Sequence, residues 1–449
     1  MTFTRSVPFA MLASSLLGCL SIQAGTETLA APTSSSTATG LLVGKLVGET
    51  NFDRTWSAFT LYKDDTRPIL QEFSLQGLLQ AQYADGNSDN GHFDIRDFKD
   101  ANAANNQSVW GDHFEARRAR IGFKSRWYQN WKFGSQIDAD TTDGANKIYR
   151  DIYELYLTYA PTDAMNVTVG KTELKFGRQQ EILSKEILTL ERSLVSNLLA
   201  PGELTGVMVN GKGIQDYWTY ELGLYGTARA RALTGYDAGT VTLGKIGYDY
   251  ASQSGLDTAL ASVHFVHNSA PGFKETDSDN FYSNASPAFT DSIALNNDIT
   301  MGRFGLITDI LYGFGYQGTA DQAGVEKSLN QTDVLGVSVI PSYFIAKGLQ
   351  LVGQLQWATS ERAQPASGNT PATTNLALYS RYEKWAPSVI QNGDNYASAY
   401  IGLNYYLYSH KLKFMNGIQY STMDGGLAKA DQTTSYHGYT FLSGLRFYF

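Results

Sequence analysis

The last eleven residues of the chain alternate between two kinds of side chain. One face of a strand over 439–449 carries Tyr439, Phe441, Leu445, Phe447 and Phe449, and the other carries Thr440, Leu442, Gly444, Arg446 and Tyr448. Because successive side chains of a strand point to opposite faces, one face is apolar and the other more polar. This arrangement suits a wall between lipid and water. In a soluble protein, three aromatic residues at the end of an edge strand would promote aggregation, so a membrane β-barrel is the favoured interpretation.

The start of the chain indicates export. One arginine, Arg5, precedes an apolar run over residues 9–22, and small residues suited to cleavage follow. These features predict a signal peptide over residues 1–24. A second interpretation stays open, because Leu16-Leu-Gly-Cys19 is similar to a lipoprotein processing box, which would leave Cys19 acylated. The protein is exported under both interpretations.

Composition excludes several function classes. Cys19 is the only cysteine, so a chain cleaved after residue 24 has no disulfide and no thiolate metal site. The six histidines are dispersed, and we expect neither a metal ion nor a cofactor. The 43 acidic and 35 basic residues give a net charge of -8, which argues against nucleic acid as a partner. After residue 24 no stretch approaches the eighteen apolar residues of a transmembrane helix.

From residue 71 to the end, the chain repeats one design. Segments of about ten residues with alternating character are joined by short turns within pairs and by long polar loops between pairs. Candidate strands span roughly 71–84, 116–127, 131–140, 153–159, 165–169 and 439–449, and strand pairs span 204–226, 239–268, 291–316, 332–360 and 396–423. The sum is about sixteen strands, an even number, as in bacterial outer-membrane barrels. We expect a flexible leader over residues 25–69 and a barrel domain over residues 70–449.

The hairpin over residues 116–140 separates its two faces most clearly. Its odd positions include Ala119, Ile121, Phe123, Trp131, Phe133 and Ile137, whereas its even positions include Arg118, Arg120, Lys124, Arg126, Asp138 and Asp140. Trp127, Tyr128 and Trp131 gather at the turn, where an interfacial aromatic girdle is expected. The odd positions therefore predict the lipid-facing side, and the even positions predict the lumen.

Five segments, in this order along the chain, resemble the phosphate-selective porin O and P family. They are Phe73–Gln80, Phe114–Phe123, Tyr153–Leu157, Val167–Gly170 and Leu190–Leu194. The resemblance implies an all-β transmembrane antiparallel barrel of sixteen strands in the bacterial outer membrane, assembled as a homotrimer, with the third long loop folded inward. It implies passive diffusion of small anions, with inorganic phosphate the best single guess. The last strand itself resembles the closing strand of bacterial outer-membrane barrels, which implies that the terminal Phe449 is part of the signal for the barrel-assembly machinery.

The same resemblance implies a set of pore residues. In phosphate-specific members, arginines line the pore and lead anions to a constriction. The matching positions here are Arg117 and Arg118, with Asp151 nearby, and Ser184, Lys185 and Arg192 on the inward loop. Strict alternation puts Arg117 and Asp151 on the lipid-facing side, so each needs a β-bulge or a strand end to reach the lumen.

A track of basic side chains follows one face of a single predicted strand: Arg118, Arg120, Lys124 and Arg126. A guanidinium is always charged, and its flat fork of donors matches a phosphate edge. A ring of such groups replaces the hydration of an anion and repels cations, so we expect an anion-preferring lumen. General diffusion with weak or cation selectivity is the alternative, because Asp138, Asp140 and Glu154 can balance these charges.

Other function classes fit less well. An outer-membrane barrel enzyme would need catalytic groups aligned on one wall, but the chain has no Gly-x-Ser-x-Gly motif and its histidines are dispersed. We therefore expect no enzymatic activity. An adhesin or structural barrel would lack an open lumen. Arg229 and Arg231 share a strand face beside a loop, where they either extend the basic track or bind lipopolysaccharide phosphates at the rim.

Overall fold

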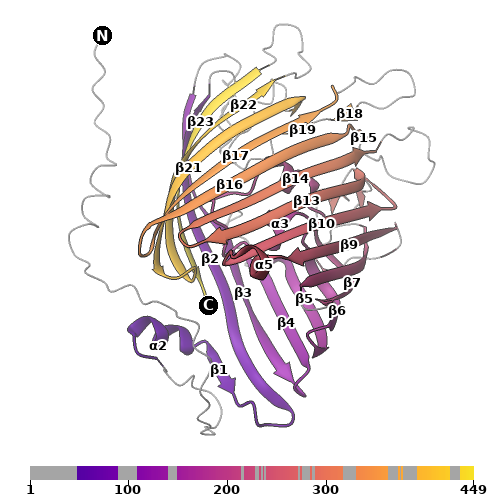
Figure 1. The fold of residues 1–449 in the computed structure, drawn as a ribbon, viewed down its shortest axis with the longest axis vertical. Coiled ribbons are helices and arrows are strands. Elements are labelled where there is room, and N and C mark those ends of the chain that lie inside the picture. The colour runs from indigo at the N-terminus through magenta and orange to yellow at the C-terminus, as the bar shows by residue number, and fades with distance from the viewer. Residues whose placement is uncertain are drawn as a thin grey trace.

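The computed structural model describes residues 48–88, 109–139, 149–213, 217–227, 232–233, 236, 239–271, 274–275, 284–285, 289–316, 330–362, 373–374, 376–377, 392–424 and 435–449. The predicted signal peptide, Cys19, Asp140, Arg229 and Arg231 lie outside these residues. Figure 1 shows tilted strands that form a barrel, with helix α2 and strand β1 beside its lower rim, near the C-terminus. Within the described ranges, no helix has the length and apolar character needed to cross a membrane.

Sixteen antiparallel strands form the barrel wall. They are β2 (Leu70–Ser88), β3 (Val109–Trp127), β4 (Trp131–Ala139), β5 (Tyr149–Thr162), β6 (Met165–Leu174), β7 (Gly202–Lys212), β8 (Trp218–Gly226), β9 (Thr240–Asp249), β10 (Thr258–Asn268), β13 (Phe289–Met301), β14 (Phe304–Gly315), β16 (Val334–Ala346), β17 (Leu349–Ser360), β21 (Asn395–Tyr408), β22 (Leu412–Asp424) and β23 (Ser435–Tyr448). Each pairs with its neighbours in chain order. The first and last strands pair from Leu78↔Tyr448 to Ser88↔Gly438, which closes the barrel and confirms the predicted strand number.

The two faces of the wall differ as alternation predicts. Large apolar side chains are exposed on the outside, such as Leu222 on β8 and Ile401 on β21. Polar side chains are buried on the inside, such as Gln354 on β17 and Asn404 on β21. On β23, Tyr439 is 55% exposed, whereas Thr440, Leu442 and Arg446 are at most 4% exposed. The closing strand therefore turns its aromatic face to lipid and its more polar face to the lumen, as expected.

Short elements lie in the connections. Three two-residue strand pairs are β11 (Lys274–Glu275) with β12 (Asn284–Ala285), β15 (Asn330–Gln331) with β18 (Thr373–Thr374), and β19 (Leu376–Ala377) with β20 (Asn392–Gly393). One helical turn, α5 (Ala251–Ser254), joins β9 to β10. These elements connect strands of the wall and add no further layer.

The chain segment before the barrel contains a helix and a strand. Helix α2 (Asn51–Ser57) begins with a capping box in which Thr50 and Asp53 each bond the backbone N–H of the other, which satisfies donors that a helix start leaves open. Strand β1 (Thr60–Lys63) then pairs antiparallel with β2. We call residues 50–63 the N-terminal clasp. The leader expected over residues 25–69 thus has regular structure in its described part.

The clasp lies over the seam where the barrel closes. Trp56 Nε1 donates to the backbone oxygen of Tyr448 at 2.6 Å. The Phe59 ring stacks on Phe449 with 3.7 Å between centroids, and the backbone N–H and C=O of Phe449 bond Gly77 on β2 at 3.1 and 3.0 Å. Strand β2 extends past the end of β23, and β1 pairs with the edge that would otherwise be left open, which protects its backbone groups.

The connection from β6 to β7, residues 175–201, packs against the inner face of the wall. It contains helix α3 (Arg178–Glu181) and helix α4 (Leu194–Leu199). On α4, Val195 and Leu199 fill the space above Gly336 and Gly313, where a Cβ atom would lie 2.4 Å from each side chain. Together with inward apolar residues of β7–β22 they form the largest buried apolar cluster among the described residues. Van der Waals packing of this kind holds the connection inside the wall.

Candidate functional site

A β-bulge at Arg117 brings two arginines to the lumen side of β3. The β2–β3 register passes from Gln80↔Arg118 directly to Ala81↔Ala116, so Arg117 is the extra residue of the bulge. A bulge of one extra residue changes the alternation locally. The Arg117 guanidinium consequently faces the interior and pairs with Glu191 of the β6–β7 connection, 2.9 Å from Nε to the carboxylate. The structure therefore has a β-bulge at Arg117, one of the two ways in which this residue could reach the lumen.

Asp151 reaches the lumen by the same device. The β4–β5 register pairs Gln136 with Glu154 and Ile137 with Ile152, so the extra residue is Tyr153. Asp151 then lies opposite Asp138. The side chain of Arg150 lies between the two carboxylates, with Nη2 3.6 Å from Asp138 and Nε 3.3 Å from Asp151. One guanidinium therefore bridges two acids that would repel each other.

Arg118 and Arg120 lie next to each other on the inner face of β3, where Arg118 is buried and Arg120 is partly buried. Arg118 donates to the Gln80 side chain at 2.6 Å. The Arg120 guanidinium lies 3.3 Å above the centre of the Tyr153 ring and donates to Ser184 Oγ at 3.3 Å. It also lies 3.5 Å from Asp138. Ser184 thus contacts the arginine cluster.

The remaining predicted residues are distributed between the cluster and its surroundings. Lys185 lies 4.5 Å above the Tyr448 ring, and burial lowers its pKa. Arg192 donates to two backbone carbonyls of its own connection and lies 3.9 Å from Glu173. Lys124 is exposed on the inner face of β3. Arg126 pairs with Asp65, just after the clasp, so it does not join the central cluster.

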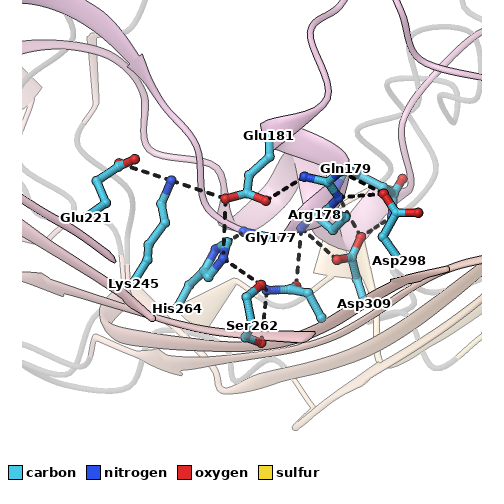
Figure 2. Close-up of polar contacts among 11 residues, drawn as sticks. Gly177, Arg178, Gln179, Glu181, Glu221, Lys245, Ser262, His264, Asp298 and Asp309 are labelled. Atoms are coloured by element: carbon cyan, nitrogen blue, oxygen red, sulfur yellow. Dashed lines mark hydrogen bonds and ion pairs between the residues drawn. The ribbon is translucent and has the colours of Figure 1, made fainter. Parts of the chain in front are cut away.

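At the first turn of the β6–β7 connection, a polar network fixes α3 to the wall (Figure 2). Asp309 on β14 accepts the backbone N–H groups of Arg178 and Gln179 at 2.7 and 3.2 Å, and His264 on β10 accepts the N–H of Gly177 at 3.0 Å. Because helix starts have open N–H groups, these side chains serve as caps supplied by the wall. Gly177 has φ +85°, a conformation that favours glycine.

The same network continues through ion pairs. Arg178 bonds Asp298 at 2.7 Å and Glu181 at 3.0 Å. Lys245 lies 3.0 Å from Glu221 and 3.6 Å from Glu181. Burial opposes ionisation of Glu181, but Lys245, His264 and Arg178, the last also through a hydrogen bond, together outweigh it and hold the pKa of Glu181 below its usual value. Charges of both signs therefore face each other on this side of the lumen.

Farther along the connection, consecutive backbone carbonyls accept hydrogen bonds from three side chains of the wall. Lys413 on β22 donates to Ile187 at 2.9 Å and to Glu186 at 3.4 Å, and Asn404 on β21 donates to Leu188 at 2.8 Å. Arg446 on β23 donates to Ile187, Thr189 and Leu190 at 2.9, 3.2 and 2.9 Å. The run 186–190 is thus held against β21–β23.

Several of these residues were not singled out by sequence reasoning. The sequence pattern places Arg446 on one face of the last strand and gives His264 only as one of the dispersed histidines. It predicts no role for Asp309, Lys413 or Asn404. Alternation could have placed them on the inner face, but nothing in the sequence states which inner residues meet the connection. In the described part of the chain, no group of His, Cys, Asp or Glu side chains is arranged to hold a metal ion.

A closed barrel of sixteen antiparallel strands, apolar outside and lined by charged and polar groups inside, defines the class of protein: it is a porin of the outer membrane. The chain belongs to the phosphate-selective porin O and P family, whose sequence model matches residues 91–449. This match confirms the resemblance drawn from the five segments. The fold and the family identify a transmembrane channel, but a fold alone does not identify the solute that the channel conducts.

Three solved structures are similar to the chain at low sequence identity. The outer membrane channel DcaP of Acinetobacter baumannii is 16% identical, with a TM-score of 0.50 over 87% of this chain and 100% of that one. An anion-selective porin from Comamonas acidovorans is 11% identical, with a TM-score of 0.48 over 84% of this chain and 99% of that one. A loop-deletion mutant of OmpT of Vibrio cholerae is also 11% identical, with a TM-score of 0.49 and the same coverage. No curated protein sequence matches the chain.

Proposed function

We propose that this porin conducts small anions in preference to cations and that inorganic phosphate is among its solutes. The observation that carries the proposal is the bulge at Arg117, which places Arg117 and Arg118 on the same side of β3, next to Arg120. A regular strand could not present consecutive arginines to one lumen. Guanidinium groups this close form a positive centre suited to the doubly charged edge of a phosphate.

The β6–β7 connection completes the proposed constriction. It brings the hydroxyl of Ser184 to Arg120 and the ammonium group of Lys185 near Lys124 of β3. We expect the connection to narrow the passage, so that solutes pass close to these groups. The interaction energy between a monovalent anion and one such charge about 4 Å away is about 4 kcal/mol in an effective dielectric of 20, far more than in bulk water.

A general diffusion porin with weak selectivity is the second candidate, and a specific observation favours it. Arg117 pairs with Glu191, Arg120 with Asp138, and Arg150 with both Asp138 and Asp151. Paired charges contribute less to the field in the lumen than free ones. The reversal potential decides between the two candidates, because it measures the net preference of the open pore.

The partners of the porin follow from the same proposal. We infer that the porin is a homotrimer in the outer membrane. We also infer that the signal peptide over residues 1–24 is cleaved during export and that the barrel-assembly machinery then recognises Phe449. Lipopolysaccharide phosphates are the expected ligands of basic groups at the outer rim. The absence of a catalytic motif in the sequence supports a channel without enzymatic activity.

The test is the reversal potential of the purified porin in planar bilayers under a KCl gradient. We expect a preference for chloride and a block of the chloride current by added phosphate. The double variant Lys124→Glu/Lys185→Glu should move the potential toward potassium, because Lys124 is exposed and Lys185 is only partly buried. The arginines of β3 are less suitable for this change, since each holds a partner in the wall or in the connection.

The control is Lys212→Glu, the same substitution made once, at the exposed end of β7 beside the turn to β8. It should leave the potential close to that of the parent. A wild-type porin that prefers potassium would refute the proposed anion preference and leave the general diffusion porin. A chloride preference without any block by phosphate would retain the anion porin and remove phosphate as its solute.

A further inference from the structure

The run 186–190 is irregular, largely buried backbone: the N–H groups of Glu186 and Ile187 bond the carbonyl of Leu183, whereas its own carbonyl groups bond side chains of the wall. Residues 186–190 include no helix or strand, and Ile187, Thr189 and Leu190 are at most 3% exposed. Buried carbonyl groups require donors, and an irregular chain cannot supply them to itself. The donors come from Lys413, Asn404 and Arg446, one from each of three adjacent strands.

Arg446 is the centre of this arrangement. It is fully buried, and its two terminal nitrogens contact three carbonyl oxygens between 2.9 and 3.2 Å away. Lys413 is also fully buried and contacts two carbonyl oxygens. Among the described residues, neither cation forms an ion pair with a carboxylate. Backbone carbonyls of the run therefore accept hydrogen bonds from both cations, and the carboxylates of Glu191 and Glu186 on the same connection add favourable charge to Arg446 and Lys413 respectively.

Side-chain packing supports the same contact. Leu190 is fully buried in a cluster with Ala84, Tyr400, Met415 and Leu442. A Cβ atom at Gly444 would lie 2.7 Å from Leu190 Cδ2, so a larger residue on β23 would displace the connection. The position of the run is thus set by polar donors and by a close apolar fit on the same strands.

We propose that Arg446 is a positioning residue for the channel: with Lys413 and Asn404 it anchors residues 186–190 to β21–β23 and so sets the width of the passage. Ser184 and Lys185 directly precede the anchored run, and Glu191 directly follows it. Movement of the run would therefore displace the partners of Arg120 and Arg117. The role of the anchor in solute passage rests on the proposed function, but the anchor itself does not depend on the sign of selectivity.

The experiment measures exposure of Thr189, whose side chain is 3% exposed. Cys19 is replaced by alanine, and Thr189→Cys supplies the only thiol. In the folded parent, a charged water-soluble thiol reagent should modify this cysteine slowly. Arg446→Gln should raise the rate at least tenfold, because at most one of the carbonyl contacts survives. Arg446→Lys keeps the charge and several donors, and its rate should lie between those of the parent and Arg446→Gln.

Folding and charge are controlled separately. Faster migration of unheated than heated protein on a denaturing gel reports a closed barrel in every variant. Lys212→Met removes one exposed lysine at the end of β7, outside the anchor, and should leave the rate of thiol modification unchanged. The pair Lys413→Met/Asn404→Leu tests the anchor without altering the closing strand, and it should also raise the rate at least tenfold.

Single-channel recordings supply the functional readout. Release of the run should increase conductance and current noise in Arg446→Gln, with partial recovery in Arg446→Lys. A thiol rate within twofold of the parent in both Arg446→Gln and Lys413→Met/Asn404→Leu overturns the anchor. A wild-type preference for potassium would refute the proposed anion function, yet the thiol rates would still support or overturn the anchor.

Discussion

Replacing Trp56 by alanine should detach the N-terminal clasp without unfolding the barrel. Trp56 donates one hydrogen bond to the backbone of Tyr448. Its ring lies 4.8 Å from that of Tyr408 and 5.3 Å from that of Phe447. All three contacts join the clasp to the wall near the seam, and the strand pairs of the wall do not include Trp56. The loss should therefore act on the clasp alone.

The size of the effect follows from these contacts. A hydrogen bond contributes about 1 kcal/mol net, and each aromatic pair contributes about 0.5–1.5 kcal/mol. The sum is about 2–4 kcal/mol, and the lower end applies because Trp56 is only partly buried. A change of about 2 kcal/mol in the free energy of clasp opening corresponds to about a 30-fold larger open population.

Limited trypsin digestion measures this population, because cleavage of a rapidly reclosing segment follows the fraction that is open. The site is the bond after Lys63, which is exposed as a side chain but paired as backbone with β2. We expect Trp56→Ala to raise the cleavage rate about 30-fold, whereas Arg54→Gln on the exposed face of α2 should change it little. Equal rates for Trp56→Ala and the parent would refute the reasoning, as would loss of the heat-dependent gel shift at the same rate as cleavage.

Two further predictions concern the same end of the molecule. The hydrogen bond from Tyr408, with further bonds from Thr50, lowers the pKa of Asp53 in the folded clasp. The ionised Asp53 therefore stabilises the clasp at pH values above the free pKa of 3.8, and this stabilisation is lost as the pH falls through the lower folded pKa. Pepsin cleavage of the clasp, relative to a free peptide of the same sequence, should therefore rise below about pH 3.8 in the parent and rise less in Tyr408→Phe. Deletion of Phe449 should lower the yield of heat-modifiable barrel while the signal peptide is still removed, because two backbone hydrogen bonds to Gly77 and the stack on Phe59 are lost; normal yield would contradict the role assigned to the terminal residue.

The wall of the barrel could be predicted from sequence because its physics is local. Alternation with period two depends on neighbouring residues alone, and it placed the sixteen strands and the two faces of β23 correctly. It also identified Arg117 and Asp151 as residues that need a bulge or a strand end to reach the lumen; the structure has a bulge at Arg117 and, for Asp151, one at Tyr153. The alternation pattern predicts that the two strands depart from regular geometry near these residues, but only the pairing register shows at which residue each bulge lies.

The interior could not be predicted in the same way, because it depends on contacts distant in sequence. Val241 and Leu243 on β9 face inward although they are apolar, since they pack in the cluster with α4. Lumen parity alone would predict polar residues there. The hydrogen bonds of Asp309 and Arg446 span 131 and 259 residues. Nothing in the strand pattern indicates which inner residues the β6–β7 connection will meet.

Closure of the barrel also sets an order of events during biogenesis. Strand β2 pairs with β3, close in sequence, and with β23, the last strand of the barrel. Until β23 is in place, β2 has one edge without its native partner. The wall therefore cannot close before every strand between them has been added, and the contact of Gly77 with Phe449 forms with that closure.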